Sequence, residues 1–170
     1  MRPFRLALAL TLALAFAAAC TSTPARDPAV VQETLEYVRK IQEWERVETE
    51  ALRAIREVQR SQFVDDDYVI ATLGGVMDDV ELHLAEIDAY QPRTPPVAEV
   101  HERYRTAWHD LHDAFAQVID TMERKDYIAL SKGTEAMRRS RSELITVAAA
   151  LNLLLKETGL KEGQQGATDS

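Results

Sequence analysis

Apolar residues recur at steps of three and four positions throughout residues 28–159, and this spacing constrains the fold more than any other feature of the sequence. Such steps place apolar side chains on one face of an α-helix, whereas a half-buried β-strand alternates apolar and polar residues. Three breaks interrupt the pattern: the aspartate run 65–67, the proline-rich segment 92–96 and the region near Asp126. The sequence therefore predicts an all-α fold with four helices.

The predicted helices begin and end at residues that favour helix termini. Pro28 suits the first turn of the first helix, where a missing backbone N–H costs nothing. Aspartates 65–67 suit the start of the second helix through capping and the helix dipole, and Thr94 is the expected N-cap of the third. The fourth helix is expected from about Asp126 to Thr158, followed by Gly159, which suits the left-handed C-cap position.

Short connections between long helices predict that consecutive helices run antiparallel. The simplest arrangement is an up-down-up-down four-helix bundle spanning residues 29–160. The three breaks argue against a single extended coiled coil, and the absence of a repeated motif argues against a tandem array. Gly74 and Gly75, inside the second helix, predict a close helix contact or a kink, with a functional hinge or the approach of a ligand as the alternative.

Comparing the heights of residues along the bundle axis predicts which side chains meet. The fourth helix is the most basic segment, and if it neighbours the acidic middle of the first, Arg138 lies near Glu48 and Arg141 near Glu45. These arginines could instead contact lipid head groups or cell-wall carboxylates. The stripe of the fourth helix that should face the core consists of Tyr127, Leu130, Met137, Leu144, Ala148, Leu151 and Leu155. Four aromatic residues on the other helices are expected to fill the core: Tyr37, Trp44, Tyr90 and Trp108.

The first 20 residues have the layout of a secretory signal. Arg2 and Arg5 precede an apolar segment, residues 6–16, which is followed by three alanines, residues 17–19. The apolar segment is too short to span a bilayer, which takes about 20 residues. Positive charge, apolar core and small-residue cleavage site are the three parts of a signal peptide.

Cys20, directly after the alanines, resembles the lipobox cysteine of bacterial lipoproteins. The resemblance implies that residues 1–19 are removed and that the Cys20 thiol is lipidated, which would anchor the chain to a membrane. It departs from the family at Ala17, where Leu is usual. The alternative is an ordinary secretory signal followed by an incidental cysteine. Thr21 stands where Asp commonly retains Gram-negative lipoproteins in the inner membrane, so the resemblance implies the outer membrane, facing the periplasm, in such a host.

Composition limits the remaining possibilities. Cys20 is the only cysteine, so no disulfide can stabilise the fold. Residues 20–28 predict a short linker after the lipidated cysteine, and the polar residues 161–170 predict a disordered tail. Cleavage before Cys20 would remove two arginines and no acidic residue, changing the formal net charge from −8 to −10. A chain this acidic is not expected to bind nucleic acid.

The sequence contains no recognised catalytic motif, so we expect neither an enzyme nor a cofactor. His83, Glu86 and His101 lie on facing shoulders of the second and third helices and are the best candidates for a shared metal ion. We nevertheless expect no metal site, because histidines at such positions more often hydrogen-bond to neighbouring polar groups. The Glu-x-x-His pairs of di-iron bundles do not occur.

Two functions of different class are compatible with these features. The first, which we favour, is a membrane-anchored, non-catalytic envelope protein that binds a protein partner through a helix face. The alternative is a bundle that binds a small ligand or metal at the shoulder of the second and third helices through His83 and His101. The first predicts an exposed apolar patch, and the second predicts that the two histidines converge.

We predict that Cys20 is the site of lipid attachment. Wild-type protein expressed in a Gram-negative host should label with radioactive palmitate, because its thiol is acylated. Cys20→Ala should abolish the label and leave the chain unprocessed or soluble, whereas the neighbouring control Thr21→Ala should keep the label. Wild-type protein without label would contradict the lipoprotein interpretation.

Overall fold

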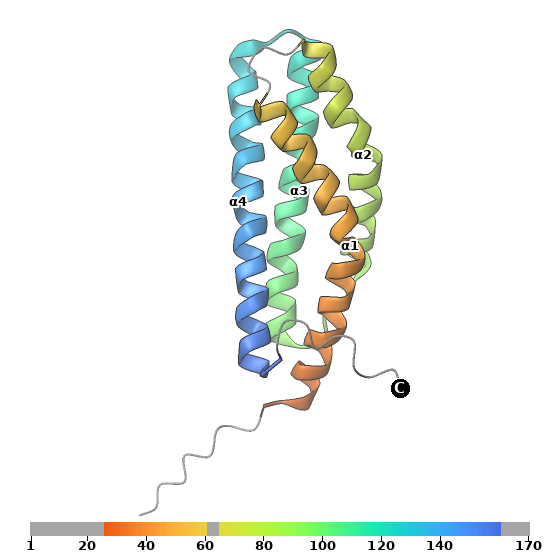
Figure 1. Cartoon of the computed structure of the whole chain (residues 1–170), viewed down its shortest axis with the longest axis vertical. Coiled ribbons are helices and arrows are strands. Elements are labelled where there is room, and N and C mark those ends of the chain that lie inside the picture. Colours follow the sequence, from red (N-terminus) through yellow and green to blue (C-terminus); the bar gives the residue numbers. More distant parts are fainter. Residues whose placement is uncertain (1–25, 61–64, 161–170) are drawn as a thin grey trace, which may run out of the picture.

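The computed structural model describes residues 26–60 and 65–160. In these two ranges the chain forms four α-helices and no β-strand: α1 (Pro28–Arg60), α2 (Asp66–Ala89), α3 (Pro95–Glu123) and α4 (Tyr127–Thr158). The helices lie side by side as an elongated bundle (Figure 1). The predicted all-α helical bundle is confirmed. None of these four helices is long and apolar enough to cross a membrane.

Residues at three of the helix ends have the roles that the sequence predicts. The carboxylate of Asp65 accepts the N–H of Asp67 at the start of α2, and that of Asp126 accepts the N–H of Ala129 at the start of α4. Gly159 follows α4 with a φ of 76°, the left-handed conformation that glycine adopts without strain. These ends are therefore set by neighbouring residues in the chain.

The start of α3 is held by a residue from another helix. Thr94 precedes α3 as predicted, but its side chain makes no capping bond, and Pro95 and Pro96 offer no N–H in the first turn. The carboxylate of Glu33 in α1, only 1% exposed, instead accepts the backbone N–H of Arg93. Burial raises the pKa of Glu33, but the nearby polar groups of Thr94 and Arg93 and the Arg93 charge more than offset it, so the pKa is lowered. An ionised carboxylate thus ties α1 to the α2–α3 connection.

The most extensive helix–helix contact joins α3 to α4. Gly133 of α4 is buried there, and a Cβ atom at this position would lie 2.8 Å from Cγ2 of Val118. Gly74 and Gly75 differ, because both are exposed on α2 and a Cβ at either would meet no described atom within 4 Å. The prediction of a close helix contact at Gly74–Gly75 is wrong, and the close contact lies at Gly133.

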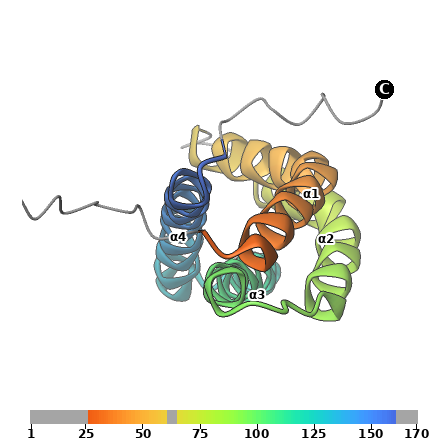
Figure 2. The same ribbon diagram turned by 90° about the horizontal axis from the view of Figure 1, so that it is seen from below.

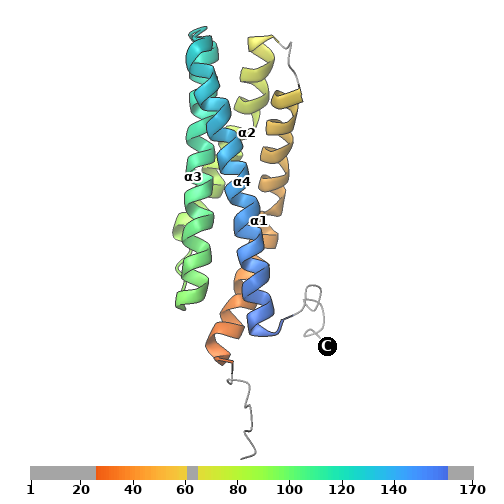
Figure 3. The ribbon, with the colours of Figure 1, turned by 90° about the vertical axis from the view of Figure 1, so that its left-hand side faces the viewer.

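α1 packs against α2 and makes few contacts with α4. The start of α1 lies near α3 and its middle lies beside α2, as the view from below shows (Figure 2). α4 lies between α3 and α1 when the bundle is viewed from the side (Figure 3). Because α4 is packed chiefly on α3, a large part of its surface is left uncovered.

This arrangement overturns the predicted ion pairs between α1 and α4. Two pairs do not form: Arg138 with Glu48, and Arg141 with Glu45. Arg138 pairs with Glu135 on its own helix at 2.6 Å, and Arg141 donates to the Gln59 side chain at 3.5 Å. The prediction assumed that α1 and α4 touch along their length, whereas these two helices touch little.

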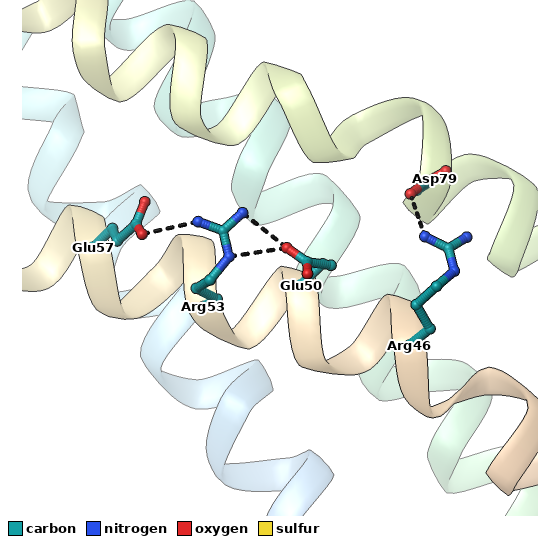
Figure 4. Close-up of polar contacts among 5 residues, drawn as sticks. All are labelled: Arg46, Glu50, Arg53, Glu57 and Asp79. Atoms are coloured by element: carbon teal, nitrogen blue, oxygen red, sulfur yellow. Dashed lines mark hydrogen bonds and ion pairs between the residues drawn. The ribbon is translucent and has the colours of Figure 1, made fainter.

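Surface ion pairs follow the α1–α2 side of the bundle (Figure 4). Arg46 of α1 pairs with Asp79 of α2, with Nη1 and Oδ2 3.1 Å apart. Arg53 lies between Glu50 and Glu57 of its own helix, at 2.8 Å and 2.9 Å. Exposed pairs of this kind contribute about 0–1 kcal/mol each, so the apolar core must supply most of the stability.

Five residues of the apolar stripe predicted for α4 are buried or half-buried, but Tyr127 and Ala148 are exposed. Tyr127 is 55% exposed, and its hydroxyl donates to the Asp66 carboxylate at 2.6 Å instead of entering the core. Ala148 is exposed, in keeping with the sparse contact between α1 and α4. The prediction that these two residues face the core is wrong.

Alanine substitutions at two of the glycines should change the free energy of unfolding in opposite directions. Gly133→Ala should lower the free energy of unfolding by about 1–2 kcal/mol, because overpacking against the stiff Val118 outweighs the gain in helix propensity. Gly74→Ala should raise it by up to about 1 kcal/mol, because the new methyl group meets nothing. Urea titrations followed by circular dichroism measure both. Equal effects of the two variants would contradict the close packing of α3 on α4.

Candidate functional site

Seven rings fill the space between α1, α2 and α3, at the shoulder where the sequence places its candidate ligands. We call them the ring cluster: Tyr37, Trp44, His83, Tyr90, His101, Tyr104 and Trp108. Trp44 of α1 stacks on Tyr104 of α3, with ring centroids 5.8 Å apart and planes 7° apart. Tyr90 is partly exposed and the other six rings are buried. The ring cluster is therefore part of the packed core.

His83 is one of two buried imidazoles in the ring cluster. It is 2% exposed, and its Nε2 lies 3.3 Å from the hydroxyl oxygen of Tyr104. Its ring meets Trp108 edge-on, with centroids 4.3 Å apart. Burial lowers the pKa of His83 to about 4, against a smaller opposing effect of Glu86. The imidazole is neutral at neutral pH.

His101 has the same kind of partner on α1. It is 4% exposed, and its Nδ1 lies 3.4 Å from the hydroxyl oxygen of Tyr37. Burial lowers the pKa of His101 and raises that of Tyr37 well above its ordinary value. Each buried histidine is thus paired with a neutral tyrosine from a neighbouring helix.

His83, Glu86 and His101 do not gather around one point. Glu86 lies at the edge of the ring cluster, where its carboxylate accepts the indole N–H of Trp44 at 2.7 Å. Residues 26–60 and 65–160 hold no group of three or more His, Cys, Asp or Glu side chains suited to a metal ion. Within the residues that the structure describes, no set of three ligands therefore comes together at the shoulder of the second and third helices.

The surface of α2 is acidic and interrupted by small residues. The helix carries seven acidic residues and no lysine or arginine. Its outward side, which we call the outer face of α2, consists of Ala71, Gly74, Gly75, Asp78, Leu82 and Ala85, all exposed. Leu82 is 68% exposed. An apolar side chain and bare helix backbone are therefore presented to solvent within an acidic surface.

The surface of α4 has the opposite character. The helix carries five basic and three acidic residues. Its outward side, which we call the outer face of α4, consists of Arg138, Ser142, Ile145, Ala149, Leu153 and Lys156, all exposed. Ile145 is 65% and Leu153 is 56% exposed. Exposed apolar residues therefore lie between basic ones.

An open groove of about 600 Å³ lies on the surface along the contact between α3 and α4. Side chains of both charge signs line it, among them Arg103, Asp110, Arg139 and Glu143. A groove with mixed charges favours neither anionic nor cationic ligands. The groove therefore indicates no particular ligand chemistry, unlike the two helix faces.

Cys20, the predicted lipidation site, lies outside the described residues, as do the predicted signal peptide and the tail 161–170. Comparison of the chain with protein-family models, curated proteins and solved structures gives no match. Evidence on function therefore comes from the sequence and from the two helix faces.

Both helix faces carry signals that the sequence analysis did not use. Residues 144–155 of α4 contain no charged side chain. A stretch of this length covers every side of the helix, whereas a bundle helix buries only one face. α2 contains acidic residues without a single basic one, which is unusual beside the mixed charges of the other helices. Neither signal reveals which residues point outward until the packing of the helix is known.

The buried state of His83 predicts how stability depends on pH. In the unfolded chain His83 has an ordinary pKa of about 6.5. In the folded chain burial lowers this pKa to about 4. The contribution of His83 to the free energy of unfolding is therefore at its full value above about pH 6.5. It falls by about 2 kcal/mol between pH 7 and pH 5. Denaturant titrations at these two pH values measure the loss.

The matched comparison uses a surface histidine. His83→Gln should reduce the pH-dependent loss by about 2 kcal/mol, leaving the part that comes from the lowered pKa of His101. His109→Gln should leave the whole loss largely in place. His109 is partly exposed and contacts Asp88 at 3.0 Å on the surface. A His83→Gln protein with an unchanged difference between pH 7 and pH 5 would contradict the burial of this imidazole.

Proposed function

We propose that this protein is a membrane-anchored, non-catalytic envelope lipoprotein that binds a protein partner through the outer face of α2. The observation that carries the proposal is the exposed pair Gly74–Gly75 in the middle of a helix. Each glycine costs about 1 kcal/mol relative to alanine, and a Cβ at either position would meet no described atom within 4 Å. A partner that must approach the α2 backbone closely would account for both glycines.

The surroundings of these glycines indicate the chemistry of the partner. Leu82 offers an apolar contact about two turns further along the same face, and Asp78 and Glu81 form an acidic rim. An apolar centre with a polar rim is the usual anatomy of a protein interface. The complementary partner is a protein with a basic surface around an apolar pocket, because opposite potentials favour association.

The lipid anchor in this proposal is supported by the sequence of residues 1–20. The charged, apolar and small-residue segments end at Cys20, the only cysteine of the chain. A signal peptide and a lipobox cysteine imply export and attachment to a membrane, and Thr21 favours the outer membrane of a Gram-negative host. A lone cysteine without a disulfide partner fits this role, since thioether lipidation consumes the free thiol.

The up-down-up-down order of antiparallel helices belongs to the same proposal. It is supported by the short connection 90–94 between α2 and α3 and by the connection 124–126 between α3 and α4, which lie at opposite ends of the bundle (Figure 1). A non-catalytic role is supported by the ring cluster, where His83 and His101 are buried against tyrosines. An acidic chain with net charge −8 supports the proposal that nucleic acid is not a partner.

Site-specific photo-cross-linking in the cell envelope tests the α2 face. A photoreactive amino acid at Leu82 of the full-length protein should form one dominant adduct with a protein that has a basic surface. Gly75→Leu should remove most of this adduct, because its side chain blocks close approach while the helix itself is favoured. The adduct is measured by immunoblotting and mass spectrometry.

The control variant is Ala116→Leu, a similar enlargement at an exposed position of α3. It should leave the adduct unchanged. An adduct that persists in Gly75→Leu, or a probe at Leu82 that reacts with no protein, would rule out the α2 face as the binding surface.

A further inference from the structure

The outer face of α4 remains without a role after the α2 face has been assigned. We propose that it lies on the surface of an anionic phospholipid membrane. The inference rests on the lipid anchor of the proposed function and adds an orientation of the bundle. Ile145, Ala149 and Leu153 enter the head-group region, and Arg138 and Lys156 meet lipid phosphates.

The anchored end of the chain enters the bundle beside this face. Arg26, the first described residue, donates from Nε to the backbone oxygen of Glu157 at 3.0 Å, at the end of α4. Arg26 is six positions after Cys20, so the tether spans at most ~20 Å. The outer face of α4 from Arg138 to Lys156 is ~27 Å long. Lipid attached at Cys20 therefore keeps this face close to the bilayer.

The charge distribution across the bundle turns the same face toward lipid. α2 carries only acidic charges, whereas α4 carries more basic than acidic ones. The two helices lie on opposite sides of the bundle (Figure 2). An anionic surface repels the first and attracts the second. The bundle therefore rests on α4 with α2 facing away from the membrane.

The pattern of side chains on α4 suits a lipid interface. Helices that lie in the plane of a membrane combine exposed apolar residues with lysines and arginines. Ile145 and Leu153 supply the apolar part, and Arg138, although paired with Glu135, remains 65% exposed. The small apolar area is enough to orient a bundle that acyl chains already hold.

A second copy of this chain is a less suitable occupant of the face. Arg138 and Lys156 lie near its two ends. If two α4 helices paired in parallel, each basic residue would meet its own equivalent. If they paired in antiparallel fashion, Arg138 of one copy would lie near Lys156 of the other. Like charges would face each other in both orientations, whereas lipid phosphates neutralise them.

The test uses the full-length lipidated protein in vesicles of phosphatidylethanolamine and phosphatidylglycerol. Cys20 is the only cysteine and its thiol is acylated, so one added cysteine can be labelled specifically with the fluorophore NBD. We compare Ile145→Cys with the control Leu82→Cys on α2, two positions of similar exposure. Emission at position 145 should shift to the blue and be quenched by nitroxide-labelled lipids, whereas position 82 should keep the emission of a water-exposed label.

The charge contribution is measured with the same probe. Arg138→Glu combined with Lys156→Glu should abolish most of the blue shift at position 145, and so should vesicles without phosphatidylglycerol. Equal emission at positions 145 and 82 in the otherwise unchanged protein would overturn the proposal. A blue shift that nitroxide lipids do not quench would indicate contact with protein, including a second copy, and would overturn it as well. Neither result bears on partner binding, which is measured separately by cross-linking at Leu82.

Discussion

Large rings occupy the space between α1, α2 and α3, and their volume decides how the fourth helix can pack. Trp44 stacks on Tyr104, and Trp108 packs against His83, so these rings fill the interfaces among α1, α2 and α3. On the other side of α3, Gly133 lets α4 approach Val118 closely. This uneven distribution of side-chain volume leaves α1 and α4 with little contact. The exposed surface of α4 is a consequence of that packing.

Polar atoms inside the ring cluster select one arrangement of these helices. His83 of α2 is paired with Tyr104 of α3, and His101 of α3 is paired with Tyr37 of α1. A buried polar group without a partner costs about 1–3 kcal/mol, so a shift of one helix along another would break these pairs at a measurable cost. Glu33 adds a similar constraint at the α2–α3 connection. In a chain with one cysteine, such pairs replace disulfides as the determinants of register.

The same packing gives the bundle two unlike sides. α2 turns acidic residues, glycines and Leu82 to solvent, and α4 turns basic residues and two large apolar side chains to solvent. In the proposed arrangement the tether and the basic side face the membrane, so the acidic side is free to meet a partner. The two faces need no communication between them, because orientation alone connects the anchor to partner binding.

The helices and most of their ends could be predicted from the sequence, because spacing, prolines and capping aspartates act through neighbours in the chain. Asp65, Asp126 and Gly159 have the roles expected of them. Which helices touch could not be predicted in this way, since any bundle is compatible with the same apolar stripes. That is why the predicted partners of Arg138 and Arg141 were wrong, and why the close glycine contact was placed at Gly74–Gly75 instead of Gly133. The depth of His83 likewise depends on the rings of two other helices, which no local pattern specifies.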